Sequence, residues 1–219
     1  MRKETKIFLR SSFPNSFCLM RQLLLATRNA HKTREFAEIL GRKFAVRDLS
    51  TEPGAPEIEE TGRTFADNAI LKAIAISKRF AGLVVADDSG LEVDALQGAP
   101  GVYSARYAGP RATDTENIAK LLSELRKRTA NPPCTARFRC VLAVAREGKV
   151  VRTFEGAIEG TIVDSPRGRT GFGYDPIFQP AGFSETFGEL SAKIKNEISH
   201  RAHAIQALRS ALADGVTWA

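Results

Sequence analysis

The sequence has few cysteines and no long apolar run, and both shortages narrow its class. Its three cysteines, Cys18, Cys134 and Cys140, are odd in number, and no two of them have CxxC spacing. This pattern argues against a disulfide framework or a zinc site and favours a reducing compartment, so we expect a cytoplasmic protein. No apolar stretch approaches the about 18 residues of a membrane-spanning helix, which predicts no membrane partner. The phosphate-loop pattern GxxxxGK[ST] is also missing, so a P-loop is excluded.

Positive charge is in excess, but it is not clustered. The chain has 32 Lys and Arg against 25 Asp and Glu, a net charge of +7. A scattered basic surface suits an anionic small molecule as readily as nucleic acid. Residues 1–19 contain no apolar h-region of about 7–15 residues, so they do not resemble a signal peptide. We interpret residues 1–19 as a disordered extension or a misassigned start, and residues 20–219 as a single domain.

Hydrophobic periodicity predicts strands and helices in alternation, followed by a β-hairpin with its turn at 146–149. This order predicts an α/β protein with a mixed sheet. The expected strands are 23–26, 44–49, 83–87, 135–145 and 150–156. Four helices are expected. One begins at Ala30, and the other three span 64–80, 113–128 and 200–212.

Two adjacent aspartates, Asp87 and Asp88, follow the apolar run LVVA and precede Ser89 and Gly90. In the ordinary interpretation they end a strand and begin a turn, as aspartate often does. In the functional interpretation they bind a cation, because open α/β sheets bind ligands at the carboxyl ends of strands. Oxygen ligands without histidine or cysteine indicate Mg²⁺ or Mn²⁺. The loop before the second helix adds three more carboxylates: Glu57, Glu59 and Glu60.

The segment ATRNAHK (26–32) joins a strand to a helix. Asn29 is a good N-cap, which places Lys32 in the first helical turn. Backbone N–H groups of a first turn attract phosphate, and a lysine there adds a point charge. The segment therefore fits a phosphate site, or equally an ordinary capped helix with a solvated lysine.

Two later segments, TGFGYDP and KIKNEISHRAHA, combine aromatic and cationic residues. Phe172 and Tyr174 alternate with glycine before Asp175. Aromatic rings stack on nucleic-acid bases, and a carboxylate or a backbone group can form hydrogen bonds with the edge of a base. Ser199 is expected to cap the last helix. The cations near that helix start are Lys195, His200 and Arg201. A structural turn and a solvated basic helix end are the alternatives.

Six stretches in one order resemble the inosine triphosphate pyrophosphatases, the XTP/dITP diphosphatases that remove non-standard purines from the nucleotide pool. They are ATRNAHKTRE, EETGRTFADNAILKA, ADDSGLEVDALQGAPGVYSARYAG, TARFRCVLAVA, GFGYDPIF and KNEISHRAHA. The resemblance implies an elongated mixed β-sheet whose flanking helices form two lobes around a central nucleotide cleft. It also implies a homodimer that hydrolyses a nucleoside triphosphate to monophosphate and pyrophosphate with Mg²⁺, for which Mn²⁺ can substitute.

The resemblance implies a role for individual residues as well. Asp88 would be the general base and a metal ligand, Glu59 a second metal ligand, and Lys32 a cation on the reacting phosphates. The residues implied to hold phosphate are Thr27, Arg28, Asn29, Ala30, His31, Lys32 and Ser89. Those implied to hold the nucleotide, the base included, are Phe172, Gly173, Tyr174, Asp175, Lys195, His200 and Arg201. One departure is Arg28, because many family members have glycine there.

Two other functions remain as alternatives. A basic nucleic-acid-binding module would account for the charge, but not for clustered carboxylates, which repel phosphate without a metal. A Maf-like pyrophosphatase acting on modified pyrimidine nucleotides would use related chemistry. Turnover of ITP against dTTP and UTP separates this last alternative from the purine-specific enzyme.

Overall fold

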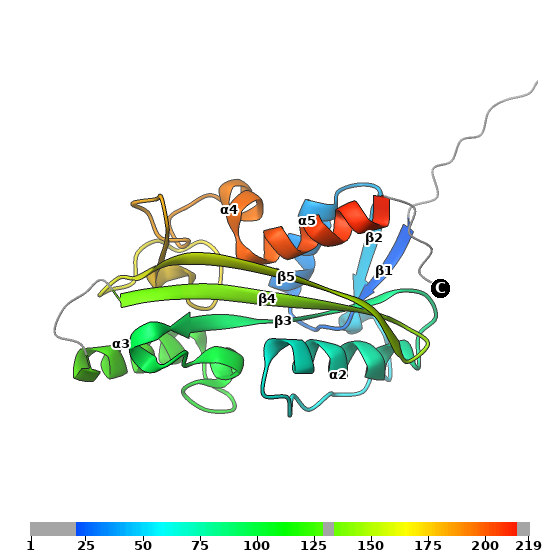
Figure 1. Ribbon diagram of the computed structural model, residues 1–219, viewed down its shortest axis with the longest axis horizontal. Helices are drawn as coiled ribbons and strands as arrows, with labels where there is room; N and C mark the ends of the chain where they lie inside the picture. Colours follow the sequence, from blue (N-terminus) through cyan, green and yellow to red (C-terminus); the bar gives the residue numbers. More distant parts are fainter. Residues whose placement is uncertain (1–20, 129–133, 214–219) are drawn as a thin grey trace, which may run out of the picture.

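A computed structural model describes residues 21–128 and 134–213, so the expectation for residues 1–19 lies outside the described residues. This part of the chain forms one six-stranded sheet flanked by helices (Figure 1). The strands are β1 (Arg21–Leu25), β2 (Phe44–Asp48), β3 (Val84–Val93), β4 (Cys134–Arg146), β5 (Lys149–Ile162) and β6 (Phe178–Pro180). The α-helices are α1 (Ala30–Leu40), α2 (Phe65–Ser77), α3 (Asp114–Arg128), α4 (Ala192–Ile198) and α5 (His200–Ala213).

The sheet is mixed, as the sequence predicts. Its strand order is β2-β1-β3-β4-β5-β6. β1 pairs in parallel with β2 and β3, whereas every pairing from β3 to β6 is antiparallel. The long strands β3, β4 and β5 run the length of the molecule and give it an elongated shape (Figure 1). None of the helices in the described ranges is long and apolar enough to cross a bilayer.

Helices cover the two faces of the sheet, and successive strand residues supply both cores because their side chains alternate. On one face, α1 and α5 pack over Leu25 and Val85. On the other face, α2 packs over Val84 and Ala86. A further core, at the far ends of the long strands, includes α3 and the segment after β5. The cores thus divide the molecule into two lobes that share one sheet.

One sequence prediction is wrong in a way that matters for the site. The strand expected at 83–87 does not end there, and Ser89 and Gly90 form no turn: β3 continues to Val93 and pairs with β4 throughout. Glycine is required at position 90 for packing. A Cβ there would lie 2.4 Å from Ser104 Oγ and 2.6 Å from the Gly101 carbonyl oxygen.

The predicted helix caps and the predicted hairpin turn are confirmed. Thr64 and Asp67 form the predicted capping box at the start of α2, and Ser199 Oγ accepts the N–H of Ala202 at 3.1 Å in the last helix. The hairpin turn between β4 and β5 has positive φ at Glu147 (51°) and Gly148 (77°), as a two-residue hairpin turn requires. The short helix α4 is an element that the sequence analysis did not predict.

Candidate functional site

The candidate site lies where β1 ends beside β3. β1 pairs with β3 only at Leu24–Val84 and Leu25–Val85, whereas β3 runs on to Val93. Beyond Val85, no strand within the described ranges covers that edge of β3. The site was expected at the carboxyl end of the strand that carries the aspartates. It lies instead at the carboxyl end of β1 and along the middle of β3.

Asp87 and Asp88 are adjacent within β3 and therefore point to opposite faces of the sheet. Asp87 contacts Lys32 of α1 and Arg201 of α5, whereas Asp88 contacts Lys72 of α2. Both aspartates are buried, with 3% and 6% of their surface exposed. The ordinary interpretation of a strand end and a turn is therefore wrong: each carboxylate meets a different set of partners.

Two cations neutralise Asp87. Arg201 Nε donates to its Oδ2 at 2.8 Å, and Lys32 Nζ donates to its Oδ1. Burial by itself would raise the pKa of Asp87, but the charges of Arg201 and Lys32 hold that pKa well below its usual value. Asp87 therefore stays ionised and fixes both cations beside the open edge of β3.

Arg201 and Lys195 extend this contact into a buried ion network. Arg201 donates from Nη1 to Glu35 Oε2 at 2.6 Å and from Nη2 to Ser89 Oγ at 2.7 Å. Lys195 Nζ lies 2.9 Å from Glu35 Oε1 and 2.5 Å from Asp175 Oδ2. All three nitrogens of Arg201 thus have protein acceptors, so its main task is to position other groups.

Asp88 has a separate environment. Lys72 Nζ donates to Asp88 Oδ1 at 2.8 Å and to Glu60 Oε1 at 2.7 Å. Asn68 Nδ2 donates to Asp88 Oδ2 at 3.3 Å, as its shared helix face with Lys72 predicts. Burial raises the pKa of Asp88, and the charges of Lys72 and Lys32 offset this only in part. A raised pKa makes an ionised carboxylate a better proton acceptor.

The two neighbouring glutamates of the EET stretch differ in position. Glu60 contacts Lys72, and Arg106 Nη1 donates to it at 2.9 Å, so it lies beside Asp88. Glu59 is exposed, and its side chain makes no hydrogen bond or ion pair within the described residues. The described ranges hold no cluster of three or more His, Cys, Asp or Glu groups suited to a metal. Because Mg²⁺ is usually held by one or two carboxylates together with substrate phosphates and waters, a carboxylate pair is sufficient.

The predicted phosphate turn has the geometry of a capped helix start. Asn29 Oδ1 accepts the N–H groups of His31 at 2.9 Å and Lys32 at 3.3 Å. Thr27 Oγ1 accepts the N–H of Asn29 at 3.1 Å. Thr27 and Lys32 are half-buried, whereas Asn29, Ala30 and His31 are exposed. The first turn of α1 is therefore exposed to solvent, with two of its N–H groups capped by Asn29.

Arg28 replaces glycine in this turn without strain. Among the non-glycine residues of the described ranges, only Gln97 and Glu147 have positive φ. The Arg28 side chain turns away to the loop before α2, where Nη2 donates to the Ala55 carbonyl oxygen at 2.7 Å. The backbone of the turn thus needs no glycine here.

A cavity of about 150 Å³ lies between the two lobes, and its lining includes Lys32 and Arg201, the two cations that contact Asp87. It is smaller than the ~300–1,000 Å³ typical of sites for drug-sized ligands, which suits one ring system better than a whole nucleotide. The predicted site residues that line it are Asn29, Lys32, Ser89, Phe172, Gly173, Tyr174, Asp175, Lys195, His200 and Arg201. The predicted residues outside its lining are Thr27, Arg28, Ala30, His31, Glu59 and Asp88.

The segment 172–175 is held in place by backbone and side-chain contacts. The Phe172 ring stacks on His31 with centroids 5.1 Å apart, which joins one lobe to α1 of the other. The Phe172 N–H donates to Asp175 Oδ2 at 2.9 Å, and the Gly173 N–H donates to Asp114 Oδ2 at 2.6 Å. Ring and carboxylate are thus fixed beside the cavity before any ligand arrives.

His200 brings an unsatisfied polar atom to the cavity. Its ring is buried and stacks on Phe138 with centroids 4.7 Å apart. Its Nδ1 is buried and finds no hydrogen-bond partner in the described part of the chain. Burial, and then the charges of Arg201 and Lys195, lower the pKa of His200 well below its usual value, so the ring is neutral. A ligand in the cavity can supply the missing hydrogen bond.

Sequence reasoning missed two residues of this site, Glu35 and Asp114, and gave a third, Glu60, no role of its own. Glu35 follows Lys32 by three positions on α1, so helical spacing alone could have indicated it. Glu60 was considered only as one of three loop carboxylates. The contact between Asp114 and Gly173 joins segments far apart in the chain, and no sequence signal predicts it.

Comparison with known proteins agrees with the family resemblance of the six sequence motifs. A sequence profile of the Ham1 family matches residues 23–211. The chain is 50% identical over 196 residues to the dITP/XTP pyrophosphatase of Bacillus licheniformis, covering 89% of this chain and 99% of the relative. It is 50% identical over 195 residues to the dITP/XTP pyrophosphatase of Bacillus subtilis, covering 89% and 98%.

Solved structures give the same result for the fold. A HAM1 protein from Coxiella burnetii superposes with a TM-score of 0.81 at 40% identity, covering 90% of this chain and 100% of that one. The Staphylococcus aureus Ham1 protein superposes with a TM-score of 0.77 at 40% identity, covering 89% and 99%. The predicted two-lobed α/β fold is thereby confirmed. By sequence, fold and arrangement of its motifs, this chain belongs to the Ham1 family.

Proposed function

We propose that this protein hydrolyses the non-standard purine nucleotides ITP, dITP and XTP to monophosphate and pyrophosphate. Support comes from its place in the Ham1 family and from relatives at 50% identity that are named dITP/XTP pyrophosphatase. The observation that carries the proposal at the site is a ring-sized cavity lined by Asn29 and Lys32 at the start of α1 and by Ser89, the residue that follows the two aspartates of β3.

The phosphates bind at the start of α1. Its first-turn N–H groups and Lys32 place positive charge where negative charge spreads during the reaction. Asp87 and Arg201 keep Lys32 in position, because all three belong to one buried contact. The positive end of the helix and the lysine are therefore organised before the substrate binds.

Asp88 acts as the general base. It accepts a proton from the water whose oxygen bonds to the α-phosphorus, and the bond from that phosphorus to the β-phosphate oxygen breaks. Pyrophosphate leaves, and the monophosphate remains. Lys72 orients the Asp88 carboxylate through its 2.8 Å contact and offsets part of the developing charge.

Asp88 and a second carboxylate would hold Mg²⁺, or Mn²⁺ in its place. Such an ion would supply charge that neutralises the phosphates and would lower the pKa of a water bound to it. The family resemblance assigns the second carboxylate to Glu59, whereas the shared Lys72 contact favours Glu60. Mg²⁺ titrations of Glu59→Gln and Glu60→Gln distinguish them: loss of the ligand should raise the Mg²⁺ requirement at least about tenfold, and the other variant should titrate like the wild type.

The base is selected by hydrogen bonding in the cavity. ITP and XTP present a 6-oxo acceptor, whereas ATP presents a 6-amino donor. With its proton on Nδ1, His200 donates to the 6-oxo group and is left facing a donor when ATP enters. An unsatisfied buried group costs about 1–3 kcal/mol, which is about one to two decades in kcat/KM.

Assembly and compartment follow the same family resemblance. We propose a homodimer, and Tyr103, which leaves 59% of its surface exposed, is the largest exposed apolar side chain in the described ranges. Light scattering should give twice the mass of one 23.9 kDa chain. We also propose a cytoplasmic enzyme, consistent with its cysteine usage, and cell fractionation tests this.

A nucleotide panel assayed for pyrophosphate release, with and without Mg²⁺, tests the function. ITP, dITP and XTP should turn over only with the metal, and ATP, which lacks the 6-oxo acceptor, should react at least about tenfold more slowly. Preference for dTTP or UTP would instead indicate the Maf-like alternative. Salt-sensitive DNA binding without turnover would indicate a nucleic-acid-binding module.

A further inference from the structure

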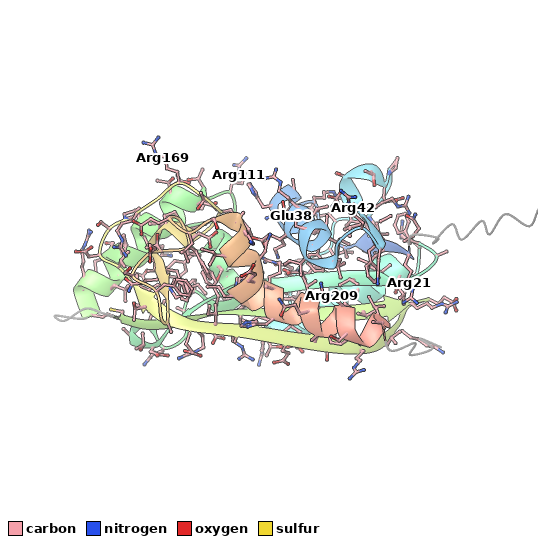
Figure 2. All side chains as sticks on the ribbon, turned by 90° about the horizontal axis from the view of Figure 1, so that it is seen from above. Arg21, Glu38, Arg42, Arg111, Arg169 and Arg209 are labelled. Carbon is pink, nitrogen blue, oxygen red and sulfur yellow. The ribbon has the colours of Figure 1, made fainter. Side chains whose placement is uncertain are left out.

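A second, larger cavity lies at the opposite end of α1 from the phosphate turn. It has a volume of about 700 Å³ and forms where α1 ends, β2 begins and α5 ends. Its described lining residues are Arg21, Leu40, Gly41, Arg42, Lys43, Phe44, Arg209 and Ala213. Figure 2 labels three of them, Arg21, Arg42 and Arg209, toward the same end of the molecule. α1 has 11 residues, so this cavity lies about 15 Å along that helix from the phosphate turn.

All the charged residues in the described lining of this cavity are positive. Four of its described lining residues are cations, and none is Asp or Glu. Within residues 21–128 and 134–213, no ion pair joins any of the four to a carboxylate. Lys32, Lys72, Lys195 and Arg201 of the candidate site, by contrast, all have carboxylate partners. The cations of the candidate site are therefore neutralised by carboxylates of the protein, whereas the cations of this cavity are not.

Two of the cations are held in fixed positions. Arg21 Nη1 donates to the Leu212 carbonyl oxygen at 2.5 Å, and Arg209 Nη1 donates to the Ile39 carbonyl oxygen at 3.2 Å. These are terminal carbonyl groups of α5 and α1, and each helix end carries about half a negative charge, which disfavours an anion. The guanidinium groups cover these ends with full positive charges, and Arg42 and Lys43 add two more. The balance therefore favours an anion.

The size and the apolar part of the lining narrow the ligand class. The volume lies within the ~300–1,000 Å³ range of small-molecule sites. Leu40 and Phe44 add apolar surface beside the cations, and Phe44 is half-buried. Arginine binds phosphate groups through paired N–H donors. A ligand with a single carboxylate would neutralise only one of the four cations, so a ligand with several phosphate charges fits the cavity better.

From these observations we infer that this cavity is a second anion site, separate from the catalytic cleft, and that it binds a di- or triphosphate, free or as part of a nucleotide. The cations Arg21, Arg42, Lys43 and Arg209 contact the phosphates. Phe44 packs against the body of a nucleotide if one is attached. Within the described residues, the side chains of Arg42 and Lys43 are exposed and make no hydrogen bond or ion pair, so replacing them removes charge and leaves the helix ends intact.

Calorimetric titration with inorganic triphosphate, without Mg²⁺ so that no hydrolysis occurs, tests the inference. The wild type should bind two molecules per chain, one at each site. The double variant Arg42→Gln/Lys43→Gln should bind one molecule at unchanged affinity, because two lost phosphate contacts weaken the second site about a hundredfold. Lys32→Gln should lose the other molecule and keep this one. Turnover of ITP by Arg42→Gln/Lys43→Gln should stay at the wild-type value.

The matched control is Lys78→Gln/Arg79→Gln, an adjacent pair of exposed cations after α2 that loses the same net charge. It should bind two molecules. Equal losses in both double variants would show a general charge effect and overturn the inference, as would one-molecule binding by the wild type that Lys32→Gln abolishes. A second titration with ADP shows whether the ligand is a nucleotide or phosphate alone. If ADP binds more tightly than triphosphate and Phe44→Leu weakens ADP binding, the ligand is a nucleotide. If ADP and triphosphate bind equally, the cavity recognises the phosphates alone. Tighter binding of a short DNA duplex with the same dependence on Arg42 and Lys43 would overturn the small-molecule assignment.

Discussion

At the scale of single residues, the environment divides the work between two adjacent aspartates. Burial acts on both, yet the pKa of Asp87 is lowered and that of Asp88 is raised. The difference arises because Asp87 meets two cations at once, whereas Asp88 shares Lys72 with Glu60. Asp87 is therefore suited to holding Lys32 and Arg201, and Asp88 is suited to accepting a proton.

Replacement of Asp88 by asparagine tests this division. Asp88→Asn keeps the shape and an acceptor oxygen for Lys72, but it removes the proton acceptor, so kcat for ITP should fall about 10²–10⁴-fold. Circular dichroism and melting temperature should remain close to those of the wild type. Asp94→Asn, at an exposed aspartate just beyond the end of β3, is the control and should retain turnover. Near wild-type turnover by folded Asp88→Asn would show that another group accepts the proton.

His200 makes stability depend on pH. Its pKa is lowered in the folded protein, so below about pH 6.5 the unfolded chain binds a proton that the folded chain does not. Stability should therefore fall as pH decreases below 6.5, by up to about 1.4 kcal/mol per pH unit. Urea unfolding at pH 7.5 and 5.5 should show that His200→Gln loses about 1 kcal/mol less than the wild type. His203→Gln, at an exposed position of the same helix, should behave like the wild type, and an equal loss in all three proteins would refute this role.

At the scale of elements, α5 is tied to β3 and α1 by one side chain. Arg201→Ala leaves Asp87 and Glu35 buried with fewer partners, which should cost about 3–5 kcal/mol of unfolding free energy. Arg139→Ala breaks the partly exposed pair with Glu155 and should cost at most about 1 kcal/mol. Because the nitrogens of Arg201 already have protein acceptors, kcat/KM for ITP and ATP should fall by a similar factor. A loss confined to ITP would show that Arg201 contacts the base directly.

Elements set by local signals could be predicted, and elements set by distant pairing could not. Asn29 and Thr64 mark helix starts through side-chain hydrogen bonds to nearby N–H groups, so the sequence alone reveals them. β3 continues through Asp87, Asp88 and Ser89 only because β4 pairs with it to the end and partners on both faces neutralise the carboxylates. The motifs indicated the site, but not which face each aspartate serves.

At the scale of the whole molecule, the net charge of +7 does not come from the buried ion network. That network balances three cations, Lys32, Lys195 and Arg201, with three carboxylates, Asp87, Glu35 and Asp175. The charge of a triphosphate at this site is therefore met by the N–H groups of α1 and Lys32 when it binds, and a metal would add charge for the reaction. The surplus positive charge lies elsewhere, in part around the cavity lined by Arg42 and Lys43.

The long strands should make the two lobes unfold as one domain, because β4 and β5 contribute to the cores of both. Leu208→Ala removes a fully buried side chain from one lobe and Leu121→Ala from the other, and each should cost about 2–5 kcal/mol. Of the three tyrosines, Tyr107 and Tyr174 pack in the core of the second lobe, whereas Tyr103 is exposed, so the change in tyrosine absorbance on unfolding reports mainly on the second lobe. In urea, tyrosine absorbance and far-ultraviolet circular dichroism should give one shared midpoint for each variant, with an unchanged slope. If Leu121→Ala moved only the tyrosine midpoint and left a second transition in circular dichroism, residues 20–219 would form two domains, and the cleft between them would be a domain interface.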